Sequence, residues 1–202
     1  MGRTMRIYDI SQEVLSSKVY PGDPSPEMTD LLRISRGDVC NLSSFSMCAH
    51  NGTHIDAPLH FIEDGAGIDE LPLDSTVGYA YVAEHYGILS AADADFIIRK
   101  AKTSAYPMSV SRILIKGDAT VSADAAKTFA ENGVLLVGNE SQTVGPEDAP
   151  AEVHNILLGK GIVLLEGIRL GEVSEGAYFL FAAPLSFKGF DGSPCRAVLI
   201  GK

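Results

Sequence analysis

Three of the chain's five histidines fall within eleven residues, at His50, His54 and His60, and Asp56 lies among them. Imidazole nitrogens and carboxylate oxygens suit Zn, Mn and Fe ions, and a catalytic metal site needs such ligands plus an open position for water. One buried histidine is more often structural than catalytic, but four such residues at this spacing favour a site. We therefore predict a divalent-metal centre in this segment.

The segment from His50 to His60 is predicted to be extended, because Gly52 and Pro58 disfavour a continuous helix. In an extended chain, positions 50, 54, 56 and 60 share one parity, so their side chains point to one side. Gly52 has the same parity and leaves room for a metal or substrate. Pro58 shares it as well, and a bend near Ala57 is therefore expected.

Two further candidate residues, His154 and Glu166, lie later in the chain. His154 falls within a predicted helix, and Glu166 follows an apolar run, where a nearby metal would explain a carboxylate. From residue chemistry alone, His154 could equally lie on the helix surface. Glu166 could equally be the charged end of a strand.

Other nucleophiles fit the sequence less well. There is no Gly-x-Ser-x-Gly elbow, and Ser43, Ser44 and Ser46 lie in a polar, strand-like stretch. Cys48 precedes His50 by two residues, which puts the two side chains on one face of an extended chain without pairing a thiol with a base. We interpret Cys48 as a packing residue.

The elements that position these residues are predicted to form a mixed α/β fold. Short strands are expected from Arg6, Leu31, Ala80 and Arg112, and over residues 134–138, 162–167, 178–185 and 196–200. Helices are expected over residues 122–133 and 150–161, with start signals at Ser122 and Pro150. The first half is therefore β-rich and irregular, and the second half contains βαβ-like units. We expect one domain spanning residues 1–202, because no linker divides the chain.

The composition limits the partners of the protein. The formal net charge is −10 and no run of Lys or Arg occurs, so nucleic acid is not an expected partner. The three cysteines, Cys40, Cys48 and Cys195, form no Cys-x-x-Cys pair, which favours a reducing compartment. Polar residues interrupt each apolar run near the start, so neither a signal peptide nor a membrane span is expected. The predicted location is cytoplasmic.

Several motifs together resemble one known family. The segment HNGTHIDAPLHF, residues 50–61, is similar to the signature of the cyclase-like metal-dependent hydrolases, which include bacterial kynurenine formamidases and isatin hydrolases. YPGDP from Tyr20 resembles the family's aromatic-Pro-Gly-Asp loop, and VHNILLGKGIVLLEGI, residues 153–168, its later His and Glu segment. The ending YFLFAAPLSFKGFDGSPCRAVLI also resembles the family's closing strands.

The resemblance implies roles for seven site residues and a swivelling β/β/α-type fold. The implied metal ligands are His50, His54, Asp56, His154 and Glu166, with Asp56 bridging two adjacent positions. His60 is the implied general acid and base, and Tyr20 the implied substrate contact. The implied cofactor is Zn or Mn, one or two ions per subunit, and the implied assembly is a homodimer or homotetramer.

The chain departs from the family pattern at two places. Tyr20 stands where kynurenine formamidases usually carry Trp, which changes the shape and polarity of the substrate wall. In the segment from residue 138, Glu140 and Thr143 are conservative replacements and Asn139 is not. We expect the fold to be unaffected and details of the pocket to differ.

These observations predict a hydrolase of a small amide or lactam. A bound divalent ion lowers the pKa of its water and polarises a carbonyl. His60, which titrates near neutral pH, would take a proton from that water and return it to the leaving nitrogen. The favoured substrate is an arylformamide such as N-formylkynurenine, and the alternatives are a cyclic amide such as isatin or another small amide or lactone. A non-catalytic metal-containing binding protein is the alternative class.

Overall fold

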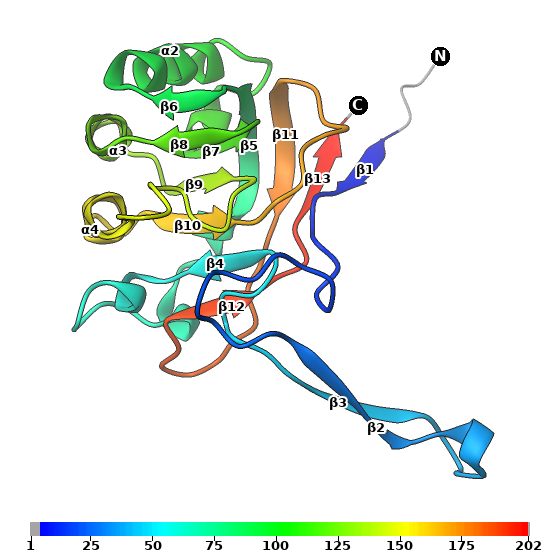
Figure 1. Ribbon diagram of the computed structural model, residues 1–202. Coiled ribbons are helices and arrows are strands. Elements are labelled where there is room, and N and C mark those ends of the chain that lie inside the picture. The colour runs from blue at the N-terminus through cyan, green and yellow to red at the C-terminus, as the bar shows by residue number, and fades with distance from the viewer. Residues whose placement is uncertain (1–4, 202) are drawn as a thin grey trace.

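A mixed β-sheet of nine strands forms the centre of the protein (Figure 1). The computed structural model describes residues 5–201. Across the sheet the strand order is β1-β13-β11-β5-β7-β9-β10-β4-β12. These strands are β1 (Arg6–Asp9), β4 (His54–Asp56), β5 (Val77–Glu84), β7 (Arg112–Lys116), β9 (Leu136–Asn139), β10 (Val163–Glu166), β11 (Gly176–Phe181), β12 (Gly192–Pro194) and β13 (Val198–Gly201).

Four neighbouring strands, β5, β7, β9 and β10, run parallel to one another. Helices α2 (Ala91–Lys102), α3 (Ala123–Glu131) and α4 (Ala151–Leu158) connect them and lie together on one side of the sheet (Figure 1). Ile97, Phe129 and Leu157, one from each helix, are buried in a common core with sheet residues such as Ile113. The predicted α/β fold with βαβ-like units in the second half is confirmed.

Helix-start signals in the sequence correspond to real helix boundaries. The Ser122 side chain accepts a hydrogen bond from the Ala125 backbone N–H at the start of α3, as expected of an N-cap. Pro150 directly precedes α4. Helix α2 was not expected from the sequence, although Ser90 and Asp93 form a capping box at its start.

Three small elements complete this arrangement. The strands β6 (Gly87–Leu89) and β8 (Ala119–Val121) form a separate parallel pair, and the short helix α1 (Leu73–Thr76) leads into β5.

Within residues 5–201, no helix is long and apolar enough to cross a membrane.

A two-stranded hairpin, β2 (Glu27–Leu32) and β3 (Leu42–Ser46), extends away from the sheet (Figure 1). A strand is present at Leu31, as predicted, but its bounds differ from the prediction: β2 begins at Glu27 and ends at Leu32, and Ile34–Arg36 forms a short 3-10 helix. The reason is local, because the register shifts between Asp30 and Leu32 and the chain then turns at Gly37 in the left-handed region.

The second face of the sheet has its own apolar core, which includes Ile55, Leu114, Leu165 and Leu199. Here β4 pairs antiparallel with β10, so that Ile55 lies opposite Leu165. This pairing joins the histidine-rich segment of the first half to a strand of the second half. It therefore fixes the relative positions of the two groups of candidate site residues.

Candidate active site

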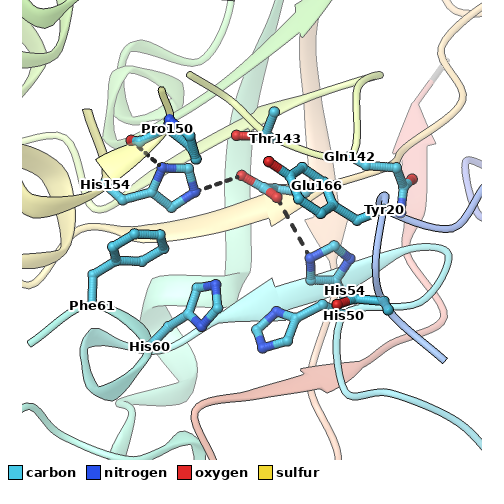
Figure 2. Close-up of a pocket in the computed structure, with 11 residues that line it drawn as sticks. Tyr20, His50, His54, His60, Phe61, Gln142, Thr143, Pro150, His154 and Glu166 are labelled. Carbon is cyan, nitrogen blue, oxygen red and sulfur yellow. Dashed lines mark hydrogen bonds and ion pairs between the residues drawn. The ribbon is translucent and has the colours of Figure 1, made fainter. Parts of the chain in front are cut away.

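A pocket of about 210 Å³ is lined by four of the five histidines and by Glu166 (Figure 2). Its lining comes from segments far apart in the sequence: the loop near Tyr20, the histidine-rich segment, the loop after β9, and elements α4 and β10. The residues that line it are Tyr20, Asp23, His50, His54, His60, Phe61, Gln142, Thr143, Pro150, His154 and Glu166.

The segment from His50 to His60 is extended over only part of its length. In β4, His54 and Asp56 lie on the same side of the strand because side chains alternate. Before β4, the chain turns at Gly52 with a φ of 68°, and His50 Nδ1 lies 2.9 Å from Asp56 Oδ1. After β4, Pro58–His60 forms a 3-10 helix. The expected convergence therefore arises from a short strand between two bends, and not from one long extended segment.

His54 is buried against two carboxylates. Its Nε2 lies 3.3 Å from Asp56 Oδ1 and 3.5 Å from Glu166 Oε2. The sheet register explains the second contact, because Glu166 is paired directly opposite His54. The other ring nitrogen, Nδ1, lies 3.1 Å from the carbonyl oxygen of Gly52, which can only accept a hydrogen bond. Nδ1 therefore carries a proton, and Nε2 is the nitrogen available to a cation.

His154 repeats this arrangement from the helix side. Its side chain is buried, its Nδ1 donates to the Pro150 carbonyl oxygen at 2.9 Å, and its Nε2 lies 3.3 Å from Glu166 Oε1 (Figure 2). Nε2 is also 3.7 Å from Asp56 Oδ2. The structure thus brings His154 and Glu166, which the residues alone left undecided, to the same carboxylate cluster as His54.

The buried carboxylates of Asp56 and Glu166 favour positive charge on the histidines beside them. Burial by itself would lower the pKa of His54, but the hydrogen bonds and charges of Asp56 and Glu166 raise it to about 10. Burial also opposes the shift at His154, whose pKa is raised chiefly by Glu166. For Asp56, burial would raise the pKa, yet His50 and His54 hold it well below its usual range. Without a metal, protonation of the histidines supplies this positive charge.

The donor set fits a divalent cation. Asp56 Oδ2 is buried and has no hydrogen-bond partner within the described part of the chain, which is costly unless a cation or proton lies near it. Ligand atoms of His54, Asp56 and Glu166 lie within 4.8 Å of one another, and so do those of His50, Asp56 and His60. Two imidazoles whose outer nitrogens bond backbone carbonyls are the usual arrangement of metal-ligating histidines.

His50 and His60 share a partner, Asp191, that was not among the residues expected from the sequence. Its Oδ2 lies 2.9 Å from His50 Nε2 and 3.2 Å from His60 Nδ1. Asp191 immediately precedes β12, in the turn at residues 189–192. In the sequence, the only sign of a role for Asp191 was its position in this turn, just before the last two strands. Burial lowers the pKa of His60, which is thus neutral at pH 7.

The two departures from the family pattern have different structural outcomes. Tyr20 lines the pocket, and its hydroxyl donates to the Glu147 carbonyl oxygen at 2.8 Å. Thr143 lines the pocket as well. Asn139 does not line it, but its side chain donates to the Thr143 carbonyl oxygen at 2.9 Å and so supports the loop after β9. Glu140 accepts backbone hydrogen bonds from Gly117 and Leu170, so its role is in the fold.

The competing nucleophiles lack suitable surroundings. Cys48 Sγ lies 3.7 Å from Asp23 Oδ2, and burial together with that carboxylate raises the pKa of the thiol. A thiol held protonated is a poor nucleophile. Ser43, Ser44 and Ser46 are exposed on β3, outside the pocket.

Comparison with known proteins assigns the chain to a family. The family described as putative cyclase matches residues 8–146, and the chain belongs to it. A curated relative, the kynurenine formamidase of Salinibacter ruber (strain DSM 13855 / M31), is 36% identical and the match covers 96% of this chain and 97% of the relative.

Solved structures agree with this assignment. The structure of a predicted metal-dependent hydrolase from Bacillus stearothermophilus has a TM-score of 0.80 at 27% identity, and the match covers 99% of this chain and 100% of that one. Isatin hydrolase A from Labrenzia aggregata has a TM-score of 0.79 at 20% identity, covering 97% of this chain and 93% of that one, and shows the same fold.

Proposed function

We propose that the protein is a metal-dependent hydrolase that cleaves the C–N amide bond of a small substrate, with the activity of an arylformamidase of the kynurenine formamidase type. The observation that carries this proposal is the buried cluster of Asp56, Glu166, His54 and His154 beside an open pocket. In it, Asp56 Oδ2 has no hydrogen-bond partner among the described residues, as fits a ligand of a cation. The similarity to a curated kynurenine formamidase over nearly the whole chain supports the reaction type.

Five residues would hold the metal. His50, His54 and Asp56 would form one position, and Asp56, His154 and Glu166 an adjacent one, with Asp56 shared. When bound, a divalent ion supplies an acidic water and polarises the substrate carbonyl. The ligand types accept Zn and Mn alike, so we propose either ion, with one or two per subunit.

His60 would act as the general acid and base. It is partly buried at the pocket, and burial keeps its pKa low enough for a neutral ring at pH 7. A neutral imidazole accepts a proton from the attacking water and then returns it to the leaving nitrogen. This sequence suits an amide, because an amine leaves poorly unless it is protonated.

Aromatic side chains would bind the flat part of the substrate. Tyr20 and Phe61 line the pocket, and the Phe61 ring lies 4.5 Å from the ring of His154, centroid to centroid. An aryl group could therefore be held beside the histidines. The structural likeness to isatin hydrolase makes a cyclic amide the second candidate substrate.

Assembly and location complete the proposal. We propose a homodimer or homotetramer, in which a second copy covers part of the exposed apolar surface of the β2–β3 hairpin, including Met28 and Phe45. A cytoplasmic location accords with the three free cysteines Cys40, Cys48 and Cys195.

The test is elemental analysis of protein purified without chelator, followed by hydrolysis assays on the same sample with N-formylkynurenine and isatin. We expect Zn or Mn in stoichiometric amount and faster turnover of the formamide. Metal without turnover of an amide, lactam or ester would favour a binding protein instead. Failure of the protein to take up metal, even after reconstitution, would refute the proposal that it is a metal-dependent hydrolase.

A further inference from the structure

The side chain of Asp191 is held at a fixed place beside the pocket by its own backbone. The Ala57 N–H donates to the Asp191 carbonyl oxygen at 2.9 Å, one residue after Asp56. Gly192, the next residue, is paired with Asp56 where β12 meets β4. The loop before it is tied to the body by a hydrogen bond from the Ile68 N–H to the Phe190 carbonyl oxygen, at 2.8 Å. These backbone hydrogen bonds therefore fix the position from which the Asp191 carboxylate extends.

One oxygen of this carboxylate contacts two imidazoles. Asp191 Oδ2 lies 3.2 Å from His60 Nδ1 and 2.9 Å from His50 Nε2. The two rings are stacked, with centroids 4.0 Å apart and an angle of 24° between their planes. A carboxylate facing a ring nitrogen favours the tautomer in which that nitrogen carries the proton.

We infer that Asp191 is a positioning residue that holds His60 as the Nδ1–H tautomer, so that Nε2 is the nitrogen that exchanges protons in the pocket. This inference rests on the proposed role of His60 as general acid and base. A base oriented in this way by a third group is a common requirement of acid–base catalysis. Asp191 itself need not touch the substrate.

The surroundings of Asp191 argue against a purely structural role. Its side chain is 44% exposed, so little apolar surface is buried with it. The nearby Asp69 already anchors the same loop, because its Oδ1 accepts a hydrogen bond from the Gly189 N–H at 2.8 Å. Asp69 forms no hydrogen bond or ion pair with His60, which makes Asp69→Asn a matched control for loop anchoring.

The first experiment measures the His60 tautomer directly. Imidazole ¹⁵N NMR on labelled protein, both as purified and after metal removal, would be compared for wild type, Asp191→Asn and Asp69→Asn, with His60→Ala used to assign the signals. We expect the Nδ1–H form of His60 in the wild type and in Asp69→Asn, and a shift toward Nε2–H in Asp191→Asn. An unchanged tautomer in Asp191→Asn would overturn the inference, whether or not the protein hydrolyses amides.

The second experiment asks through which histidine Asp191 acts. In Asp191→Asn we expect kcat for N-formylkynurenine to fall about 10- to 100-fold, with KM within about twofold and metal content unchanged. Adding Asp191→Asn to His60→Ala should cause no further loss, since residues that act as a unit are not additive. Loss of metal in Asp191→Asn, or a further loss of rate in the double variant, would instead assign the effect to His50. An inactive wild type with the expected tautomers would contradict the proposed function alone.

Discussion

The Nε2 atom of His154 and the Oε1 atom of Glu166 lie 3.3 Å apart, although one residue comes from a helix and the other from the end of a strand. The helix also places Pro150 where its carbonyl fixes the outer nitrogen of His154. Glu166 Oε1 is itself held by the Val144 N–H at 2.8 Å. Both groups are thus oriented by hydrogen bonds within the protein, which favours tight metal binding.

Metal binding and turnover should separate between two histidines. We expect His54→Ala to lose most of its metal and its activity, because His54 faces both Asp56 and Glu166. His60→Ala should keep the metal and lose most turnover, about 10²-fold or more. Elemental analysis and steady-state kinetics on the same samples measure both quantities. Equal loss of metal in the two variants would contradict this division of roles.

The stability of metal-free protein should fall as the pH rises. The pKa of His54 is raised to about 10 in the folded state, so its protonation stabilises the fold fully below the unfolded pKa of about 6.5. This stabilisation is lost between about pH 6.5 and 10 and amounts to a few kcal/mol at most. Thermal unfolding of chelator-treated protein at pH 6.5, 8 and 9.5 would show a decreasing Tm.

Added zinc should reverse this trend, because metal and protons compete for the same nitrogens. We expect the increase in Tm on adding zinc to grow with pH across the same range. His54→Ala provides the comparison and should show a weaker pH dependence without metal. A metal-free Tm that does not change over this range would mean that the histidine cluster is not protonated in the folded protein.

Gly192→Ala should weaken metal binding although it replaces none of the proposed ligands. A Cβ at this position would lie 2.6 Å from His50 Cε1 and 3.0 Å from the Ile55 carbonyl oxygen, so the His50 ring must move. We expect metal affinity to fall about 10-fold or more. Gly171→Ala is the control, because nothing lies within 4 Å of its added Cβ. Competition with a metal indicator dye gives both affinities, and equal values would refute the prediction.

The hydroxyl of Tyr20 should matter for substrate binding more than for stability. Tyr20→Phe removes a hydrogen bond to the exposed Glu147 backbone, which is worth about 1 kcal/mol at most. We expect a severalfold higher KM for N-formylkynurenine, with kcat nearly unchanged and a Tm within about 3 °C. Tyr20→Trp introduces the residue usual in kynurenine formamidases and tests whether this side chain forms part of the substrate-binding wall. A KM that is the same in all three proteins would remove Tyr20 from the substrate site.

Local patterns in the sequence predicted most of the fold and the centre of the site. The apolar run before Glu166 and the caps at Ser122 and Pro150 mark elements whose formation depends on nearby residues. Alternation along a strand was enough to put His54 and Asp56 on one side. Where several short-range signals compete, the prediction was poorer, as in the turn at Gly52.

The sequence by itself determined which ligand types are available and that three histidines and an aspartate lie close together. Only the tertiary structure decided that Glu166 lies opposite His54, that His154 faces inward, and that Asp191 joins His60 across 131 positions of the chain. The physical reason is that these contacts depend on strand register and on helix packing against the sheet. Both are set by burial of the whole apolar core, which no local segment specifies.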